Sequence, residues 1–137
     1  MALQQNLELD RSPSGAFIAA SWIALGLGLI AFIVMLANAT TMPMAERGFY
    51  FVVLMYGLFA AVSVQKSVRD RAEGVPVTGI YYGLSWVSVL MTVLLLSVGL
   101  FNATMPAAEK GFYGMAFVLC LFGAITVQKN TRDKTMS

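Results

Sequence analysis

The chain has 137 residues, of which 58% are hydrophobic and only 12% are charged, whereas soluble domains carry about 25% charged residues. Nine basic and seven acidic residues are too few to solvate a globular surface, which excludes a soluble enzyme, a nucleic-acid binder and a disordered tail. There is no His and only one Cys, so zinc, copper and haem sites lack their ordinary ligands. We expect no cofactor and no metal.

The charges are clustered and leave long stretches without any. Each of these stretches has at least 18 residues, enough for a helix of roughly 27 Å, close to the ~30 Å hydrocarbon core of a bilayer. The sequence therefore predicts an all-α membrane protein with four transmembrane helices. The four uncharged stretches are Ser12 to Ala45, Gly48 to Gln65, Gly74 to Ala108 and Gly111 to Gln128.

Start and stop signals place the four helices along the chain. Ser12 and Pro13 form an N-cap and first-turn pair for the first helix, and Asn38 is expected to end it. Pro43 and Pro106 fit the first turns of the second and fourth helices, where the missing N–H costs nothing. The helices are expected to span about 12–38, 43–66, 78–103 and 106–129.

The second half of the chain repeats the first. Residues 42–70 align with residues 105–133 at a spacing of 63, and 15 of the 29 pairs are identical; the first helices match more weakly at a spacing of 64. Duplicating a unit with two spans keeps both copies in the same orientation, so two tandem, parallel-oriented helical hairpins are predicted. The expected organisation is an N-terminal cytoplasmic segment, two two-helix repeats and a C-terminal tail: 1–13, 14–73, 74–134 and 135–137.

The basic residues predict the sidedness. Both termini and the central loop share one side of the membrane in this arrangement, and most of the basic residues lie there. The positive-inside rule therefore places both termini in the cytoplasm. The basic residues of this side are Arg11, Lys66, Arg69, Arg71, Lys129, Arg132 and Lys134.

Three repeated motifs resemble a known family. Each half has an Asn-Ala-Thr loop, a Glu-Arg-Gly-Phe-Tyr or Glu-Lys-Gly-Phe-Tyr helix start, and a Gln-Lys-x-x-Arg-Asp exit. From about Ser14 to Lys134 the chain resembles the YiaA/YiaB bacterial inner-membrane proteins. The resemblance implies a multi-pass protein of the bacterial inner (plasma) membrane with a duplicated two-helix domain, and it transfers no catalytic residue.

Two charged motifs are candidate sites. The Gln-Lys-x-x-Arg-Asp exits carry Lys66, Arg69, Lys129 and Arg132, which either anchor the helix ends at the headgroups or bind anionic lipid or an acidic partner. On the opposite side, the acidic residues of the pairs Glu46-Arg47 and Glu109-Lys110 suit helix N-termini. The two pairs could instead form a shallow site for a small charged solute.

Small residues recur at helical spacing on three of the four helices. In a bilayer such residues allow helices to approach closely, so these faces are expected to meet another helix, either within the bundle or between copies. A four-helix unit also leaves much of each helix facing lipid, so a homo-oligomer is expected. The candidate packing residues are Ala20, Ala24, Gly28, Gly57, Ala61, Ala116, Cys120 and Ala124.

These features favour a non-enzymatic inner-membrane protein that acts through self-association and through contacts with membrane lipids or a protein partner, whose identity the sequence does not reveal. Nucleic acid is not an expected partner. The alternative is a small oligomeric channel or transporter for a small solute. An ion-coupled carrier is disfavoured because none of the four uncharged spans contains an ionisable residue near the midplane.

Overall fold

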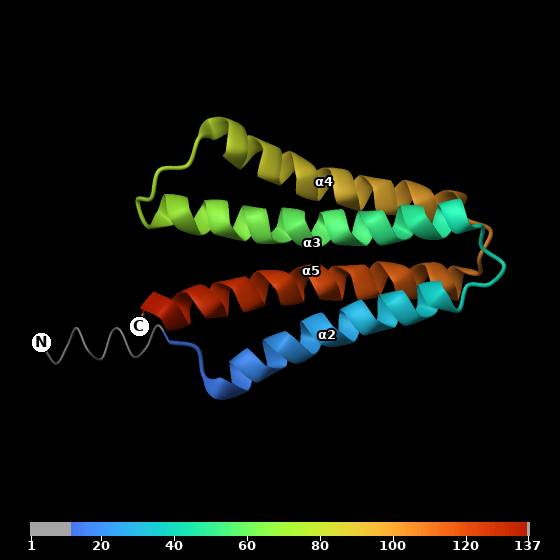
Figure 1. Ribbon diagram of the computed structural model, residues 1–137, viewed down its shortest axis with the longest axis horizontal. Helices are drawn as coiled ribbons and strands as arrows, with labels where there is room; N and C mark the ends of the chain where they lie inside the picture. Colours follow the sequence, from blue (N-terminus) through green and yellow to red (C-terminus); the bar gives the residue numbers. More distant parts are fainter. Residues whose placement is uncertain (1–11, 137) are drawn as a thin grey trace, which may run out of the picture.

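The computed structural model describes residues 12–136, which form four α-helices (Figure 1). All four helices are long and apolar enough to cross a membrane. This confirms the predicted all-α membrane fold with four spanning helices. Arg11 and most of the N-terminal segment lie outside the described residues. The helices are α2 (Gly15–Ala37), α3 (Met44–Ala72), α4 (Gly79–Asn102) and α5 (Ala107–Met136).

The helix starts show one error in the sequence prediction. The N-cap of α2 is Ser14, whose Oγ accepts a hydrogen bond from the N–H of Phe17 at 3.1 Å. The predicted start at Ser12 and Pro13 is wrong, because the Ser14 hydroxyl is the group that satisfies a free N–H of the first turn. Thr78 caps α4 in the same way, so α4 begins at Gly79, one residue after the expected start.

The second helix of each repeat continues farther than predicted. Both α3 and α5 pass their expected ends at Lys66 and Lys129, so the Gln-Lys-x-x-Arg-Asp motifs are helical. An ion pair of 2.8 Å between residues four apart supports each extension. Gly74, at φ 78°, follows the C-cap residue Glu73 of α3. Glycine adopts this left-handed conformation without steric cost.

The two repeats interlock. In Figure 1 the helices lie side by side in the order α4, α3, α5, α2, so that α2 packs on α5 and α4 packs on α3. The first helix of each repeat therefore packs against the second helix of the other repeat, whereas α2 and α3 touch only slightly. The central helices α3 and α5 are also the more buried, whereas the outer helices α2 and α4 leave most of their apolar residues exposed.

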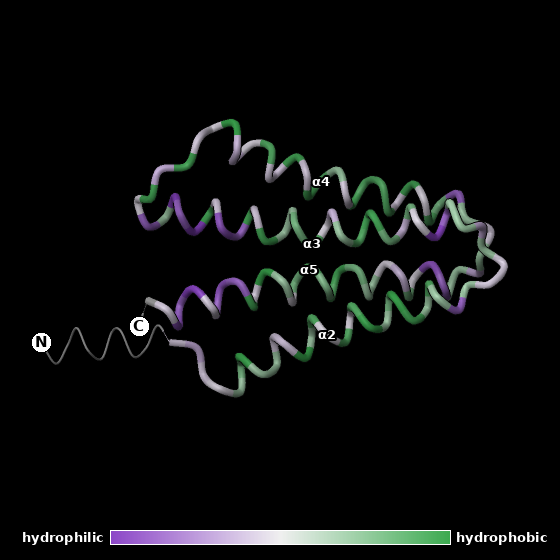
Figure 2. The backbone as a smooth tube through the Cα atoms, viewed as in Figure 1, coloured by the Kyte–Doolittle hydropathy of each residue, from purple (hydrophilic) through white to green (hydrophobic). Residues whose placement is uncertain are grey.

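The bundle has two polar ends. We call the end with the two Asn-Ala-Thr loops the loop end, and the opposite end, with the α3–α4 connection and the end of α5, the clasp end (Figure 1). Figure 2 shows hydrophilic residues gathered toward these ends and hydrophobic residues along the middle of the helices. This distribution suits a protein whose middle lies in hydrocarbon.

Glycines bring α2 and α5 unusually close. A Cβ on Gly28 would lie 2.9 Å from the backbone N of Cys120, and a Cβ on Gly123 would lie 2.6 Å from the backbone N of Leu25. The two backbones therefore touch directly, as small residues permit in membrane helices. At the centre, a Cβ on Gly57 would meet the Phe117 ring at 2.8 Å.

The other predicted packing residues differ in their placement. Ala20 is exposed and lies outside the contact between α2 and α5, and Ala24 is partly buried. The remaining small residues of α3 and α5 lie in the core, where they allow the large side chains of the neighbouring helices to pack. These core residues are Ala61, Ala116, Cys120 and Ala124.

Candidate functional site

The two charged helix exits meet at the clasp end and bind each other. Arg69 of α3 forms an ion pair with Asp133 of α5. Reciprocally, Arg132 of α5 pairs with Asp70 of α3, with 2.5 Å between Nη1 and Oδ1. Each pair joins one repeat to the other. We call this cluster the clasp; it comprises Lys66, Arg69, Asp70, Glu73, Lys129, Arg132 and Asp133.

Glu73 bridges the two arginines of the clasp. Its carboxylate accepts a hydrogen bond from Arg69 Nε at 2.5 Å and another from Arg132 Nη2 at 2.7 Å. These bonds hold the pKa of the Glu73 carboxyl below its ordinary value. A carboxylate between two guanidinium groups is favoured in its charged form, so Glu73 strengthens the clasp at neutral pH.

Burial separates the arginines of the clasp from its lysines. The side chains of Asp70 and Asp133 are 5% and 7% exposed, and those of their partners Arg132 and Arg69 are 20% and 23% exposed. The side chains of Lys66 and Lys129 are 54% and 48% exposed. All four residues considered for lipid or anion contact thus pair with the buried aspartates, but the arginines are mostly buried and the lysines are half exposed to the surroundings.

Acid is expected to weaken the clasp. A carboxyl whose pKa is lowered by folding stabilises the fold at pH values above its unfolded pKa, and this contribution is lost as the pH falls through the folded pKa. The melting temperature in detergent should therefore drop below about pH 4.3, the ordinary pKa of Glu. Glu73→Gln should show a smaller drop; an equal drop would contradict the role of Glu73.

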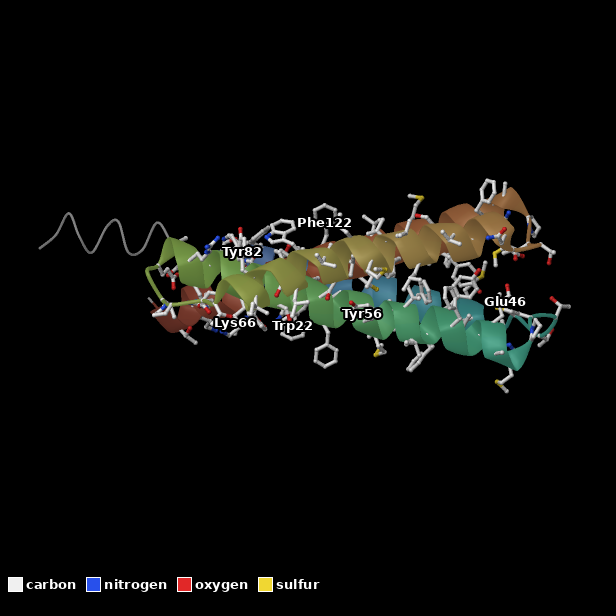
Figure 3. All side chains as sticks on the ribbon, turned by 90° about the horizontal axis from the view of Figure 1, so that it is seen from above. Trp22, Glu46, Tyr56, Lys66, Tyr82 and Phe122 are labelled. Carbon is white, nitrogen blue, oxygen red and sulfur yellow. The ribbon has the colours of Figure 1, made fainter. Side chains whose placement is uncertain are left out.

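The loop end holds a cavity of about 320 Å³ between the two Asn-Ala-Thr loops. Glu46 and Glu109, one from each repeat, line this cavity together, and Figure 3 shows Glu46 at this end, opposite Lys66. Arg47 does not line the cavity; its Nε donates a hydrogen bond to the carbonyl of Met42 at 3.1 Å. Lys110 also lies outside the lining. Of the predicted outer-face residues, the structure unites the two carboxylates only.

An aromatic cluster fills the bundle below this cavity. The Phe32 ring meets the Tyr113 ring edge-on with centroids 5.2 Å apart, and Tyr113 stacks on Tyr50 at 5.8 Å. All three side chains are at most 1% exposed. Since Tyr50 and Tyr113 follow Glu46 and Glu109 by one helical turn, the cluster closes the centre of the bundle directly below the loop-end cavity.

The face formed by α2 and α5 has an apolar groove of about 820 Å³. Four of its lining residues are small: Gly28, Ala31, Gly114 and Ala116. The duplicated positions on the face formed by α3 and α4 carry the larger residues Thr92, Leu95, Phe51 and Val53, respectively. The duplication has therefore produced two unequal faces, a grooved face and a filled face.

The described part of the chain, residues 12–136, contains no group of three or more His, Cys, Asp or Glu side chains that could hold a metal ion. Most of its charged groups are ion-paired in the clasp or lie at the loop end, Arg71 lies over the Tyr82 ring, and the free thiol of Cys120 is buried in the core.

Four spanning helices with polar ends define a multi-pass membrane protein. The family model for the yiaA/B two helix domain matches the chain twice, over residues 17–70 and 81–133. The chain belongs to the YiaAB family. It is 53% identical over 120 residues to the inner membrane protein YiaA of Escherichia coli (strain K12), a match that covers 88% of this chain and 82% of that protein.

This similarity and the four helices identify the chain as a multi-pass inner membrane protein. No solved structure matches it.

Sequence reasoning missed the contacts across the clasp. It placed Lys66 and Asp70 four residues apart on one helix face, but it could not show that α3 lies beside α5. The duplication itself contained a usable signal. The two identical exits belong to parallel repeats and lie at the same depth, so the arginine of each repeat can reach the aspartate of the other repeat.

Proposed function

We propose that this protein is a non-enzymatic inner-membrane protein that acts by assembling with copies of itself and by contacting lipids or a protein partner through its membrane-facing surface. The observation that supports this proposal is the difference between the grooved face of α2 and α5 and the filled face of α3 and α4. Helix association in a bilayer depends on close packing, and a groove with small residues can accept the large side chains of another copy.

The residues that line the groove favour a second molecule of this protein as its occupant. The filled face offers Phe51 and Phe59, which are 45% and 75% exposed. A filled face set into the groove of the next copy gives a head-to-tail contact, which builds a ring or a chain in the plane of the membrane. This geometry requires the two repeats to differ at the groove positions, as they do.

Filling the groove is expected to block assembly. Gly114→Phe restores the residue that the first repeat has at position 51, and a Cβ on Gly114 meets nothing within 4 Å. The variant should therefore fold normally but shift from oligomer to monomer, with at least a tenfold weaker association, about 1.4 kcal/mol. Light scattering in mild detergent or subunit counting in lipid nanodiscs measures the shift.

Gly83→Phe is the matched control. Gly83 also has open space at its Cβ. It lies on α4, and its duplicated position, Ala19, does not line the groove, so Gly83 lies outside both the groove and the counterpart of the groove on the filled face. This variant should keep the oligomer of the wild-type protein. A monomeric wild-type protein in lipid, or an unchanged oligomer of Gly114→Phe, would refute self-association through the groove.

For sidedness we propose that the clasp end faces the cytoplasm. The basic residues at this end outnumber those at the loop end, and the positive-inside rule then places both termini inside. Reporter fusions at the C-terminus and in the Asn-Ala-Thr loops test this arrangement. A periplasmic signal from the C-terminal fusion would reverse it.

The channel alternative is weaker. Glu46 and Glu109 share a cavity that could receive a small cation, but the buried Phe32, Tyr50 and Tyr113 rings fill the bundle directly beneath it. A pore through one copy would have to displace this cluster. Solute flux in liposomes that exceeds that of empty liposomes and falls in Glu46→Gln and Glu109→Gln would favour transport over assembly.

A further inference from the structure

A second cavity, of about 230 Å³, lies between the start of α2 and the end of α5. Its lining passes from the last apolar turn of α5, at Val127, to the charged turn at Lys134, and so lies at the level where the hydrocarbon ends. Trp22, a residue type that favours the membrane interface, stands at the cavity and is 56% exposed. The lining residues are Ile18, Trp22, Val127, Asn130, Thr131, Lys134 and Thr135.

Asn130 brings an unused hydrogen-bond acceptor to this cavity. The residue is 3% exposed, and its Nδ2 donates to Ser21 Oγ at 2.9 Å. Ser21 Oγ in turn donates to the carbonyl of Phe17 at 2.8 Å, which fixes the direction of both bonds. Within residues 12–136 the buried Oδ1 of Asn130 accepts no hydrogen bond, and an unmet buried acceptor costs about 1–3 kcal/mol.

The duplicated position shows that the bundle does not need this amide. There, between α4 and α3, the first repeat has Ser67, which is fully buried and donates to the carbonyl of Ser63 at 2.8 Å. The guanidinium of Arg71 lies over the Tyr82 ring, 4.1 Å from its centroid. Figure 3 shows Tyr82 near Lys66, at the clasp end of the bundle. The first repeat thus has a satisfied hydroxyl and a cation–π contact at this site.

The second repeat has changed the lining as a group. Each change adds a polar group or removes bulk: Ile18 stands where the other repeat has Tyr82, so the aromatic platform for a cation is absent. The polar side chains Asn130, Thr131, Lys134 and Thr135 occupy the positions of Ser67, Val68, Arg71 and Ala72. The polar lining of the cavity is therefore specific to the contact between α2 and α5.

We propose that this cavity binds the headgroup of a phospholipid that carries a phosphate and a terminal N–H or O–H donor. The donor bonds Asn130 Oδ1, the phosphate lies beside the Thr131 hydroxyl and Lys134, and the acyl chains leave past Trp22 into the bilayer. The Thr135 hydroxyl borders the cavity but donates to the carbonyl of Arg132 at 2.9 Å. Ethanolamine and glycerol headgroups have such a donor. Choline, with three methyl groups on its nitrogen, cannot donate to the amide.

This inference rests on the proposed contact with lipids, but it does not depend on self-association. The test compares wild-type protein with Asn130→Ser, the residue that the first repeat uses. A serine can bond a carbonyl of its own helix, as Ser67 does, so the variant should keep the fold. Ser67→Ala is the matched control, because it alters the duplicated buried position without touching the cavity.

Delipidated protein is mixed with phosphatidylethanolamine, phosphatidylglycerol or phosphatidylcholine of identical acyl chains, and lipid retention is measured by native mass spectrometry. We expect the wild type and Ser67→Ala to retain the first two lipids at least about tenfold better than phosphatidylcholine, the effect of satisfying one buried, otherwise unmet acceptor. Asn130→Ser should lose this preference while its melting temperature stays within a few degrees.

Equal retention of all three lipids by the wild type would overturn the proposal. A preference that survives in Asn130→Ser would also overturn it, as would a preference for phosphatidylglycerol alone, which would indicate charge instead of a donor. The oligomeric state of the same samples is read independently. Loss of lipid preference with an intact oligomer, or the reverse, therefore distinguishes failure of this site from failure of self-association.

Discussion

Residues 1–74 and 75–137, expressed together as two separate chains, are expected to form one stable complex, whereas neither chain alone should form a stable monomer. The reason is the interlocked packing: α2 packs on α5 and α4 on α3, while α2 and α3 touch only slightly. A single repeat would leave the buried faces of both helices without their partners.

The two chains carry different affinity tags, and co-purification in detergent followed by size-exclusion chromatography measures the complex. A single repeat expressed alone should aggregate or pair with a second copy of itself, since two identical repeats can imitate the two halves. A monodisperse, protease-resistant monomer of residues 1–74 would contradict the interlocked arrangement.

Arg69→Ala is expected to lower the free energy of unfolding by on the order of 2–3 kcal/mol. The substitution leaves Asp133, whose side chain is 7% exposed, with only a half-exposed lysine as a cationic partner, and breaking a buried ion pair costs about 3–5 kcal/mol. The lower figure allows for the 23% exposure of the Arg69 side chain. Reversible unfolding in mixed detergent micelles measures the change.

Lys129→Ala tests the same aspartate from its exposed side. The Lys129 side chain is 48% exposed, and exposed pairs contribute less than about 1 kcal/mol. We therefore expect a markedly smaller loss than with Arg69→Ala. Equal losses from the two substitutions would show that charge near Asp133, and not the link between α3 and α5, provides the stability.

The sequence was sufficient for the number and approximate positions of the helices. Uncharged stretches long enough to span a bilayer identify helices without any knowledge of their partners, and the duplication defines the repeats. The ends were less predictable. Capping at Ser14 in place of Ser12 depends on one local hydrogen bond. The extension of α3 and α5 is supported by ion pairs within each helix and by the arginine–aspartate pairs, which form only when α3 and α5 are packed together.

The partner of each helix could not be predicted from one sequence. Closed hairpins and interlocked repeats bury the same kinds of residues, and small residues such as Gly28 and Gly57 indicate close contact without naming the helix contacted. The candidate site shares this limit. The clasp, the groove and the proposed headgroup cavity between α2 and α5 all combine residues from different repeats. Each becomes visible only when α2 is placed on α5 and α3 is placed beside α5.

Disulfide cross-linking of α2 to α5 tests this placement most directly, since the groove and the proposed headgroup cavity both lie between these helices. A Cβ on Gly123 would lie 2.9 Å from the Cβ of Leu25 and 2.6 Å from its backbone N. The two helices must therefore separate by roughly 1 Å before the cysteines reach the Cβ–Cβ distance of a disulfide, about 3.5–4.5 Å. The pair Leu25→Cys and Gly123→Cys is made in a Cys120→Ser background, with a protease site in the connection around residue 75. Leu25→Cys with Ala60→Cys, the duplicated position on α3, is the control.

After oxidation in membranes and cleavage of the connection, the 25–123 pair should hold the two fragments together on a non-reducing gel and release them on reduction. The 25–60 pair should remain as free thiols. Separation of the fragments with the first pair, together with a disulfide in the second, would contradict the interlocked repeats.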